Sequence, residues 1–474
     1  MGRRSRVASG VAVVAVMAKP YPCPHGRCIY CPGGGELPQS YVEVSPVVVR
    51  AEKVGYDPYK QVWMRLKQIE GMGYKPSKVE LIIMGGTFTA TPLEYQEWFV
   101  KSCFDAMNAY PNGSEDIRSR RSFSLEEAHL KNENAQARCV ALTIETRPDW
   151  AKEKHIDNML RLGATRVEIG VQSIYEDVLK IIERGHTIED VIEATRLLKD
   201  AGFKVCYHLM PGLPGSDYNR DLEMFKRVFS ERNFMPDMLK IYPTLVVEGT
   251  KLYEMWLRGE YKPLDEKEAI ELLIEAYQYM PRWVRIQHVQ RDIPASYIKA
   301  GVRRRNLRQI VEIEIERRGL KNPDIRYREV GRAASRGIKP NYDAVKILRT
   351  DYEANEGMEI FLSAEDVEND VLMGVLRLRI PSEKAHRWEV DSSTAIIREI
   401  HVYGLQVPVG EEPRGEAQHR GFGKTLLREA ERIASEEFDK RKILVISGVG
   451  ARQYFRKLGY RRPSDSPYMM RCIG

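Results

Sequence analysis

Short apolar runs rich in β-branched residues alternate with longer amphipathic stretches over the first 300 residues of this 474-residue chain. Six such runs lie at residues 11–18, 79–86, 140–146, 166–173, 205–210 and 238–245. Apolar strands joined by helices are typical of parallel sheets that are covered on both faces. The pattern therefore predicts an α/β fold with a parallel sheet or partial barrel, whose site lies at the carboxyl ends of the strands.

Three cysteines follow the first apolar run in the spacing C-x4-C-x2-C, at Cys23, Cys28 and Cys31. Three thiolates on one short loop can bind three irons of a 4Fe–4S cluster and leave the fourth iron open for chemistry. Tyr30, just before the third cysteine, resembles the aromatic residue of radical S-adenosylmethionine (SAM) loops. The alternatives are a zinc site or cysteines that only pack in the core. A zinc ion needs a fourth ligand, and His25 would have to reach the same ion from between the cysteines that bind it. The spacing favours the cluster.

Polar residues interrupt several of the apolar runs. Gly85, Gly86 and Thr87 close the second run, where glycines let a ligand approach the backbone and strand-end carbonyls can bind an amino group. Polar side chains in buried strands are costly unless they bind something, although for Glu168 an outward, solvated position is the alternative. The residues of this kind are Glu145, Glu168 and Gln172, and Lys240 in the sixth run is a candidate catalytic residue.

The composition is that of a globular protein that needs no membrane span, with 43% hydrophobic and 30% charged residues. A net charge of +7 permits nucleic-acid binding without demonstrating it. The other four of the seven cysteines are scattered, which favours a reducing, cytoplasmic compartment. Arginines followed by the apolar residues 11–18 together resemble a short secretory signal, but we interpret residues 11–18 as a buried strand. No run reaches the ~20 apolar residues that are needed to cross a membrane.

The pattern changes in the last third of the chain. We expect a domain at 1–300, a basic, arginine-rich linker at 301–340 and a second domain at 341–474 with antiparallel strands that include 371–380 and 396–403. Gln418-x-x-Gly421-x-Gly423 opens a helix, and backbone N–H groups at a helix N-terminus bind a pyrophosphate. With the downstream segment Tyr454–Tyr460, this spacing indicates the coenzyme A loop of an N-acetyltransferase fold, and a plain glycine turn is the alternative.

Taken together, the chain resembles the catalytic subunit of the Elongator complex, in its single-chain archaeal or bacterial form. The motifs that carry this resemblance run in family order over nearly the whole chain: Cys23–Pro32, Val79–Phe88, Thr143–Asp149, Leu209–Gly215, Arg291–Pro294, Arg398–Gly404 and Gln418–Lys424. The resemblance implies a radical SAM domain, a partial (βα)6 TIM-like barrel, followed by a GNAT-type α+β acetyltransferase domain. It implies a tRNA-modifying enzyme that uses a 4Fe–4S cluster, SAM and acetyl-CoA to place a carboxymethyl group on carbon 5 of the wobble uridine.

The resemblance also implies roles for individual residues. Cys23, Cys28 and Cys31 would hold the cluster, with Tyr30, Gly85, Gly86, Thr87, Glu145 and Gln172 around the cluster and SAM. The acetyl-CoA residues would be Lys78, expected beside the radical site, and Glu399, Ile400, His401, Val402, Gln418, His419, Arg420, Gly421, Gly423 and Tyr454. The catalytic candidates are Lys78, Lys240 and Tyr454. Phe455 departs from acetyltransferases that carry a proton-donating tyrosine there, so either Tyr454 substitutes or the reaction is not ordinary amine acetylation.

In the implied reaction, a radical made from SAM abstracts hydrogen from the acetyl methyl, the carbon radical adds to the uridine, and thioester hydrolysis leaves the carboxymethyl group. The implied partners are tRNA and an electron donor, a homodimer is left open, and no membrane is expected. Two other interpretations stay open: a protein lysine acetyltransferase with a structural iron–sulfur domain, and an RNA-binding scaffold. We further expect one basic surface for tRNA, formed by the arginines at 118, 120, 121, 303–305, 308, 326, 328, 332 and 336.

Overall fold

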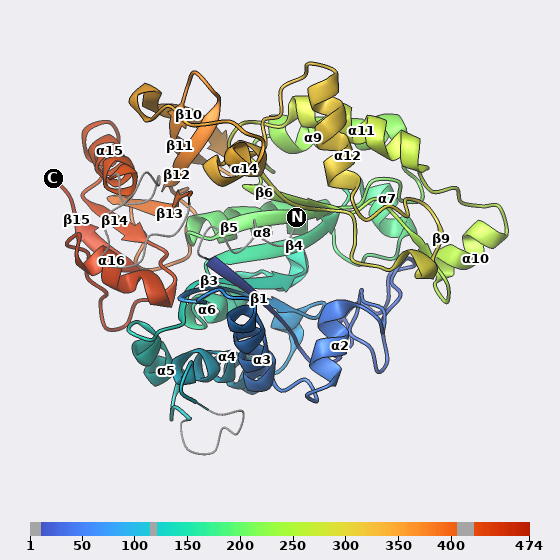
Figure 1. Ribbon diagram of the computed structural model, residues 1–474, viewed down its shortest axis with the longest axis horizontal. Coiled ribbons are helices and arrows are strands. Elements are labelled where there is room, and N and C mark those ends of the chain that lie inside the picture. Colours follow the sequence, from blue (N-terminus) through green and yellow to red (C-terminus); the bar gives the residue numbers. More distant parts are fainter. Residues whose placement is uncertain (1–10, 114–120, 405–420) are drawn as a thin grey trace.

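The computed structural model describes residues 11–113, 121–404 and 421–474. Its larger sheet has seven parallel strands in the order β1-β2-β3-β4-β5-β6-β8 and remains open, as expected of a partial barrel (Figure 1). The strands are β1 (Val11–Met17), β2 (Lys78–Met84), β3 (Arg138–Thr146), β4 (Arg166–Gln172), β5 (Lys204–Leu209), β6 (Met238–Ile241) and β8 (Arg285–Val289). The six predicted strands are confirmed, and β8 is an additional strand at the sheet edge.

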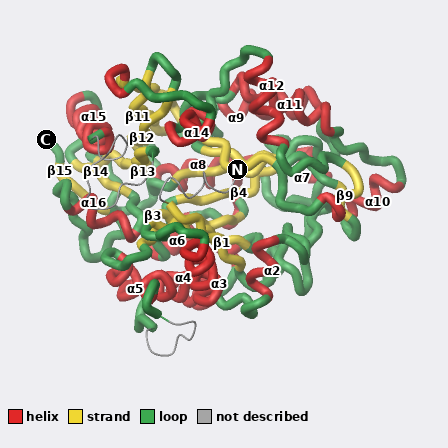
Figure 2. Tube along the Cα trace, in the orientation of Figure 1, coloured by secondary structure: helices red, strands yellow, loops and turns green. Residues whose placement is uncertain are grey.

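Amphipathic helices connect these strands and cover the sheet (Figure 2). They are α2 (Pro46–Glu52), α3 (Pro58–Gly71), α4 (Leu93–Ala109), α5 (Leu125–Asn132), α6 (Glu153–Arg161), α7 (Glu176–Ile181), α8 (Ile188–Asp200), α9 (Tyr218–Ser230), α10 (Lys251–Leu257), α11 (Glu266–Tyr279) and α12 (Leu307–Arg317). Helix α8 shows why these segments form helices. Thr187 caps its first turn by accepting the Asp190 N–H, and Val191, Ala194 and Leu198 recur at helical spacing on its buried face. No helix in these described ranges is long and apolar enough to span a bilayer.

A second, six-stranded sheet follows. Its strands are β10 (Val345–Ala354), β11 (Gly357–Asp366), β12 (Val371–Ile380), β13 (Thr394–Val402), β14 (Lys442–Val445) and β15 (Met469–Cys472). All neighbours are antiparallel except β13 and β14, which pair in parallel only over Thr394–Ile397, so from Arg398 onward β13 remains paired with β12 alone. Helix α15 (Phe422–Glu436) packs its apolar face on this sheet, and α16 (Arg452–Arg456) follows β14. This α+β unit confirms the predicted fold class; the proposed domain limits remain a prediction.

The second sheet docks on the amino ends of the barrel strands, the edge opposite the cysteine loop (Figure 1). Arg398 of β13 donates two hydrogen bonds of 2.7 Å to Asp237, which directly precedes β6. The approach is close enough that a Cβ on Gly448 would lie 2.0 Å from the carbonyl oxygen of Val140 in β3. Buried ion pairs and backbone contact therefore hold the two units together.

The arginine-rich segment between the sheets is folded rather than extended. Besides α12 it holds the short helices α13 (Ile325–Arg328) and α14 (Val330–Ser335). Arg328 is only 1% exposed and pairs with Glu365, and Arg308 pairs with Asp324 at 3.0 Å. The prediction that all these arginines share one open surface is therefore wrong for Arg308 and Arg328, which support the fold; positions 118 and 120 lie outside the described residues.

Candidate functional site

The cysteine loop and the glycine pair meet at the carboxyl edge of the barrel. The loop follows β1, and Gly85 and Gly86 follow β2, its parallel neighbour in the sheet. A Cβ on Gly86 would lie 3.8 Å from Cys23 Sγ and 3.1 Å from Gln39 Cβ, and one on Gly85 would lie 3.1 Å from Ala18 Cβ. Both glycines also have positive φ, +134° and +76°, which disfavours other residues. The structure thus brings together two motifs that lie roughly 60 residues apart along the chain.

The sulfur atoms fit a cluster better than a single zinc ion. Around one zinc ion, Zn–S bonds of about 2.3 Å hold tetrahedral sulfurs roughly 4 Å apart. In the part of the chain that the structure describes, the one His/Cys/Asp/Glu group with all ligand atoms within 4.8 Å is Glu168, Cys206 and His208, so at least one pair of the loop sulfurs is more than 4.8 Å apart. A 4Fe–4S cluster requires wide spacing because each cysteine binds a different iron.

Polar groups surround the three sulfur atoms. Ser40 donates its backbone N–H to Cys31 Sγ at 3.2 Å, and the Thr87 hydroxyl lies 3.6 Å from Cys23 Sγ. Burial raises the pKa of Cys23, while Thr87 and two buried arginines, Arg184 and Arg147, oppose that rise. Donors and cations beside these sulfurs stabilise thiolates, the form that binds iron.

Tyr30 anchors the loop. Its side chain is buried in an apolar cluster that includes Leu179, Ile182 and Leu213. Burial raises its pKa well above the usual value, so its hydroxyl stays protonated. Contact of Tyr30 with SAM or the cluster remains a prediction.

Inside the barrel, Lys240 of β6 lies between two buried glutamates. Its Nζ is 2.9 Å from Glu145 Oε1 and also pairs with Glu168 of β4. His208 Nε2 is 3.0 Å from Glu168, and the Tyr41 hydroxyl donates to Glu145 at 3.4 Å. The sequence singled out Glu145, Glu168 and Lys240 but missed His208 and Tyr41. His208 could have been found from the alternation of side chains along β5, because it lies two residues after Cys206 and therefore points to the same side of the strand.

This network keeps its charges. Burial raises the pKa of Glu168, but Lys240, His208 and Arg166 lower it more, and the net pKa lies well below the usual range. Burial likewise lowers the pKa of Lys240, but Glu145 and Glu168 outweigh it and raise the pKa well above its usual value. The lysine is therefore a fixed cation at neutral pH rather than a base. Gln172 ends β4 nearby with φ +69°, and a Cβ on Gly170 would lie 2.8 Å from its Nε2.

Charged pairs continue along the barrel to its amino edge. Arg166 pairs with Glu168 at 3.2 Å and with Glu80 of β2 at 2.6 Å. Lys204, the first residue of β5, pairs with Glu399 of the second sheet at 3.1 Å. Ion pairs thus extend from the carboxyl half of the barrel to the docked domain.

Lys78 does not lie beside the cysteine loop. It is the first residue of β2, whereas Gly85 follows the last, and seven strand residues at about 3.3 Å each separate them by roughly 20 Å. The expectation that Lys78 lies beside the radical site is therefore wrong. It lies instead at the amino edge next to Arg138, which Gly450 of the second domain contacts closely. Its role as an acetyl-CoA contact remains a prediction.

The second candidate site surrounds the start of α15. Gly421 caps this helix with φ +87°, and a Cβ on Gly423 would lie 3.1 Å from Tyr454 Oη and 3.4 Å from Val402 Cγ2. The structure therefore brings together Val402, Gly421, Gly423 and Tyr454, as the sequence predicted. Tyr454 is 40% exposed, and burial raises its pKa. Gln418, His419 and Arg420 lie outside the described residues.

The other predicted residues of β13 point to two sides of the strand, with Glu399 at the domain interface and Ile400 toward the core of the second sheet. Glu399 pairs with Arg377 at 2.9 Å as well as with Lys204, and the His401 ring stacks on Tyr403 with centroids 4.4 Å apart. Ile400 packs against the core of the second sheet. Glu399 is thus committed to holding the domains, and its role toward acetyl-CoA remains a prediction.

Phe455 belongs to the core. It is buried with Leu426, Ala430 and Val445, whereas Tyr454 on the same turn is open to solvent beside Gly423. A hydroxyl near the helix N-terminus can therefore come from Tyr454 and not from position 455.

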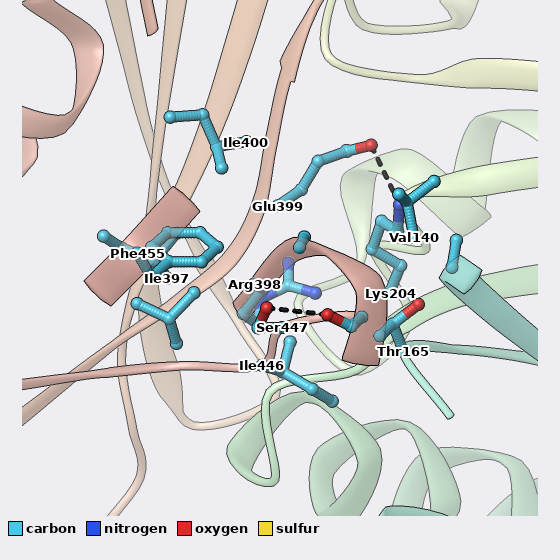
Figure 3. Close-up of a pocket in the computed structure, with 14 residues that line it drawn as sticks. Val140, Thr165, Lys204, Ile397, Arg398, Glu399, Ile400, Ile446, Ser447 and Phe455 are labelled. Carbon is cyan, nitrogen blue, oxygen red and sulfur yellow. Dashed lines mark hydrogen bonds and ion pairs between the residues drawn. The ribbon is translucent and has the colours of Figure 1, made fainter. Parts of the chain in front are cut away.

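A small cavity lies between the two sheets where β13 and β14 diverge (Figure 3). Its volume is about 80 Å³, and Thr165 and Lys204 line it from the barrel while Glu399 and Ser447 line it from the second sheet. A cavity of this size admits a few water molecules and no coenzyme.

Comparison with known proteins agrees with this architecture. The model of the Radical SAM superfamily matches residues 20–228, and the Radical_SAM C-terminal domain matches residues 236–317. The matched ranges contain the cysteine loop, the glycine pair and the barrel strands β2 to β6 and β8, so fold and site together define a radical SAM protein.

Relatives that match over nearly the whole chain show which family of radical SAM proteins it belongs to. The chain is 54% identical over 464 residues to the tRNA uridine(34) acetyltransferase of Methanocaldococcus infernus, covering 96% of this chain and 85% of that protein. It is 44% identical to human Elongator complex protein 3 over 479 residues, 99% of this chain and 85% of the relative. The chain belongs to the Elongator complex protein 3 family. A solved archaeal Elp3 from M. infernus, lacking its N-terminus, is 50% identical with a TM-score of 0.86, covering 98% of this chain and 100% of that one.

Membership of the radical SAM superfamily implies a 4Fe–4S cluster and SAM. The three spaced sulfurs, their donors and the Gly85–Gly86 cradle fit those groups. Sequence reasoning missed Arg147 and Arg184, because an arginine on a loop carries no local signature of the sulfur that it will approach in the fold.

Proposed function

We propose that this chain is a tRNA-modifying enzyme that uses SAM radical chemistry and acetyl-CoA to place a carboxymethyl group on carbon 5 of the wobble uridine. The observation that carries this proposal is the presence of two sites on one chain. One is a cysteine loop with a glycine cradle, and the other is a glycine-capped helix N-terminus beside a tyrosine. The names of the relatives, tRNA uridine(34) acetyltransferase among them, support the tRNA uridine as substrate.

The residues divide the work by location. Cys23, Cys28 and Cys31 would hold the cluster, and the backbone at Gly85–Gly86 can bind the amino group of SAM because no side chain blocks it. When bound, the cluster and SAM supply the one-electron chemistry that an unactivated acetyl methyl requires. Lys240, a fixed cation between Glu145 and Glu168, can orient a carbonyl oxygen inside the barrel.

At the second site, the first free N–H groups of α15 would bind the coenzyme A pyrophosphate, helped by the helix dipole. The open space over Gly421 admits the coenzyme, and Tyr454 Oη, beside Gly423, can give a proton to the leaving thiolate. We also propose the limits 1–300, 301–340 and 341–474 for the two domains and the segment between them, since the sheets end at Val289 and begin at Val345. An electron donor, tRNA and a homodimer remain proposed partners.

The test compares carboxymethyluridine formed by wild type and by Gly421→Glu, incubated anaerobically with SAM, acetyl-CoA, reductant and bulk tRNA and read by nucleoside mass spectrometry. The new carboxylate should repel the coenzyme phosphates and abolish the product, while iron content and SAM cleavage persist. Gly319→Glu is the matched control: both glycines have positive φ, +66° and +87°, and at both positions a Cβ meets nothing within 4 Å.

Equal carboxymethyluridine from Gly421→Glu and wild type would refute acetyl-CoA binding at α15. Acetylated protein lysine with unchanged tRNA, from wild type under the same conditions, would instead favour the lysine acetyltransferase interpretation.

A further inference from the structure

Two polar side chains, one of them buried, approach the same sulfur of the cysteine loop. His25 Nε2 lies 3.2 Å from Cys28 Sγ, and Arg184 Nη1 donates to the same sulfur at 3.6 Å. Cys28 and Arg184 are both buried. The hydrogen-bonding neighbours of the other two loop sulfurs are neutral, a backbone N–H on Cys31 and a hydroxyl beside Cys23, although the charges of Arg184 and Arg147 also act on Cys23. Cys28 is therefore the ligand with the strongest donors.

The hydrogen bonds of His25 fix which ring nitrogen carries the proton. Arg147 Nη1 lies 2.7 Å from His25 Nδ1, and an arginine can only donate. Nδ1 must therefore accept, so the proton lies on Nε2, which faces Cys28 Sγ. Arg147 is itself held by two 2.9 Å bonds to Asp149 and by the carbonyl oxygen of Arg184 at 2.7 Å.

Two glycines make room for this arrangement. A Cβ on Gly170 would lie 2.4 Å from Arg184 Nη2, which donates to the Gly170 carbonyl at 2.7 Å. A Cβ on Gly185, whose φ is +77°, would lie 2.7 Å from His25 Cβ. The backbone is thus shaped around both donors, which marks the contacts to Cys28 as part of the fold.

We propose that His25 and Arg184 raise the reduction potential of the cluster through Cys28, with Arg147 as the positioning residue that holds His25 in its donating tautomer. N–H donors to a ligand sulfur withdraw electron density, and they stabilise the reduced cluster more because it is the more negative. Burial strengthens the effect, since little water screens the guanidinium. The inference rests on the cluster implied by the radical SAM superfamily and not on the proposed tRNA reaction.

The first test is a reductive titration of the full-length, anaerobically reconstituted protein with Ti(III) citrate, followed by EPR, without tRNA or acetyl-CoA. Each titration adds one electron to the oxidised cluster. His25→Leu should shift the equilibrium about tenfold toward the oxidised form, which is ~59 mV for one electron. Arg184→Met should do the same, and Arg147→Met should shift it less.

Arg27→Met is the matched control. Arg27 lies on the same loop, is exposed, and donates to the carbonyl oxygens of Cys31 and Pro32 rather than to a sulfur. Its loss should change the equilibrium less than about twofold, because solvent screens its charge. Potentials of His25→Leu and Arg184→Met equal to wild type, at full iron content, would overturn the proposal.

A second measurement covers variants that fail to hold the cluster. Pulsed EPR of reduced wild type labelled with ¹⁵N-histidine should show a weak nitrogen coupling through the N–H···S contact, and His25→Gln should lose it while keeping a donor and a potential close to wild type. Absence of the coupling overturns the proposal. A strong coupling does so too, because His25 would then bind iron directly.

Discussion

Asp237→Asn removes the anion at the centre of the domain interface. Asp237 is fully buried, accepts two 2.7 Å hydrogen bonds from Arg398, and also accepts the Val205 N–H at 2.8 Å. Arg377 lies 3.5 Å from the same carboxylate. The change leaves two buried guanidiniums short of one negative charge.

Removing one partner of a buried pair costs about 3–5 kcal/mol, because the other charge stays desolvated. Here Arg398 keeps Glu359 at 2.7 Å, and Arg377 keeps Glu399 at 2.9 Å. We therefore expect Asp237→Asn to lower the stability of the interface by the lower end of this range, about 3 kcal/mol. Since about 1.4 kcal/mol corresponds to a factor of ten, amides at the interface should exchange with solvent roughly 100-fold faster.

The assay is native-state hydrogen exchange on the anaerobic holoprotein, which avoids treating a two-domain chain as two-state. Glu353→Gln is the control, because its partner Arg232 is 72% exposed and the pair joins the same two domains at the surface. Such a pair contributes under about 1 kcal/mol. Asp237→Asn combined with Arg398→Met should cost less than the sum of the single changes.

The same carboxylate gives a pH dependence. Burial raises the pKa of Asp237, but Arg398 and Arg377 lower it more, and the net pKa lies well below the usual range. The stabilisation is therefore complete above the unfolded pKa of about 3.9 and is lost as pH falls below it. Interface exchange that is equal in Asp237→Asn, in Glu353→Gln and in wild type would refute the assignment of this pair as the main link between the domains.

Three further changes test the sites and the fold. Replacing Cys23, Cys28 and Cys31 by Ala should remove about four irons and the visible absorption, whereas Cys103→Ala, a buried cysteine outside the loop, should retain both by iron assay. Burial raises the pKa of Asp221 to about 7, although hydrogen bonds from Ser216 and Gly212 lower it. Wild-type stability should therefore fall as pH rises from about 4 to 7, and Asp221→Asn should flatten that decline in thermal melts. Phe455→Tyr should destabilise by about 1–3 kcal/mol, because its hydroxyl would be buried without a partner, and should leave carboxymethyluridine per folded protein unchanged. Tyr454→Phe should do the reverse, with unchanged melting and reduced product; a product yield equal to wild type would exclude Tyr454 as the proton donor.

The strands were predictable where burial on both faces made them continuous apolar runs. Residues 371–380 match β12 at both ends for this reason. Strand β8 was missed because Arg285, Gln287 and His288 interrupt its apolar residues at the sheet edge, where one side is polar.

The site was predictable where residue type alone carries the chemistry. Cysteine spacing has a local signature, whereas a glycine pair alone is a weak signal, so Gly86 was placed with Cys23 through the resemblance to radical SAM folds. Arg184 could not be placed in this way, since its approach to Cys28 depends on the packing of β4 and the loop after α7. The error at Lys78 was avoidable, because the first residue of a parallel strand always lies at the edge opposite the site.

The docking of the second domain on the amino edge has a kinetic consequence. The cysteine loop lies at the carboxyl edge of the barrel, and the start of α15 belongs to the domain docked on the amino edge, so a large polyanion resting on the first need not cover the second. With the function proposed above, the tRNA and acetyl-CoA would load in either order, and saturation with one would leave the dissociation constant of the other unchanged. Any coupling measured between them would then have to travel through the protein, and the charged pairs that join Glu145, Lys240, Glu168 and Arg166 inside the barrel, with Lys204 and Glu399 at its edge, are the contacts available to transmit it.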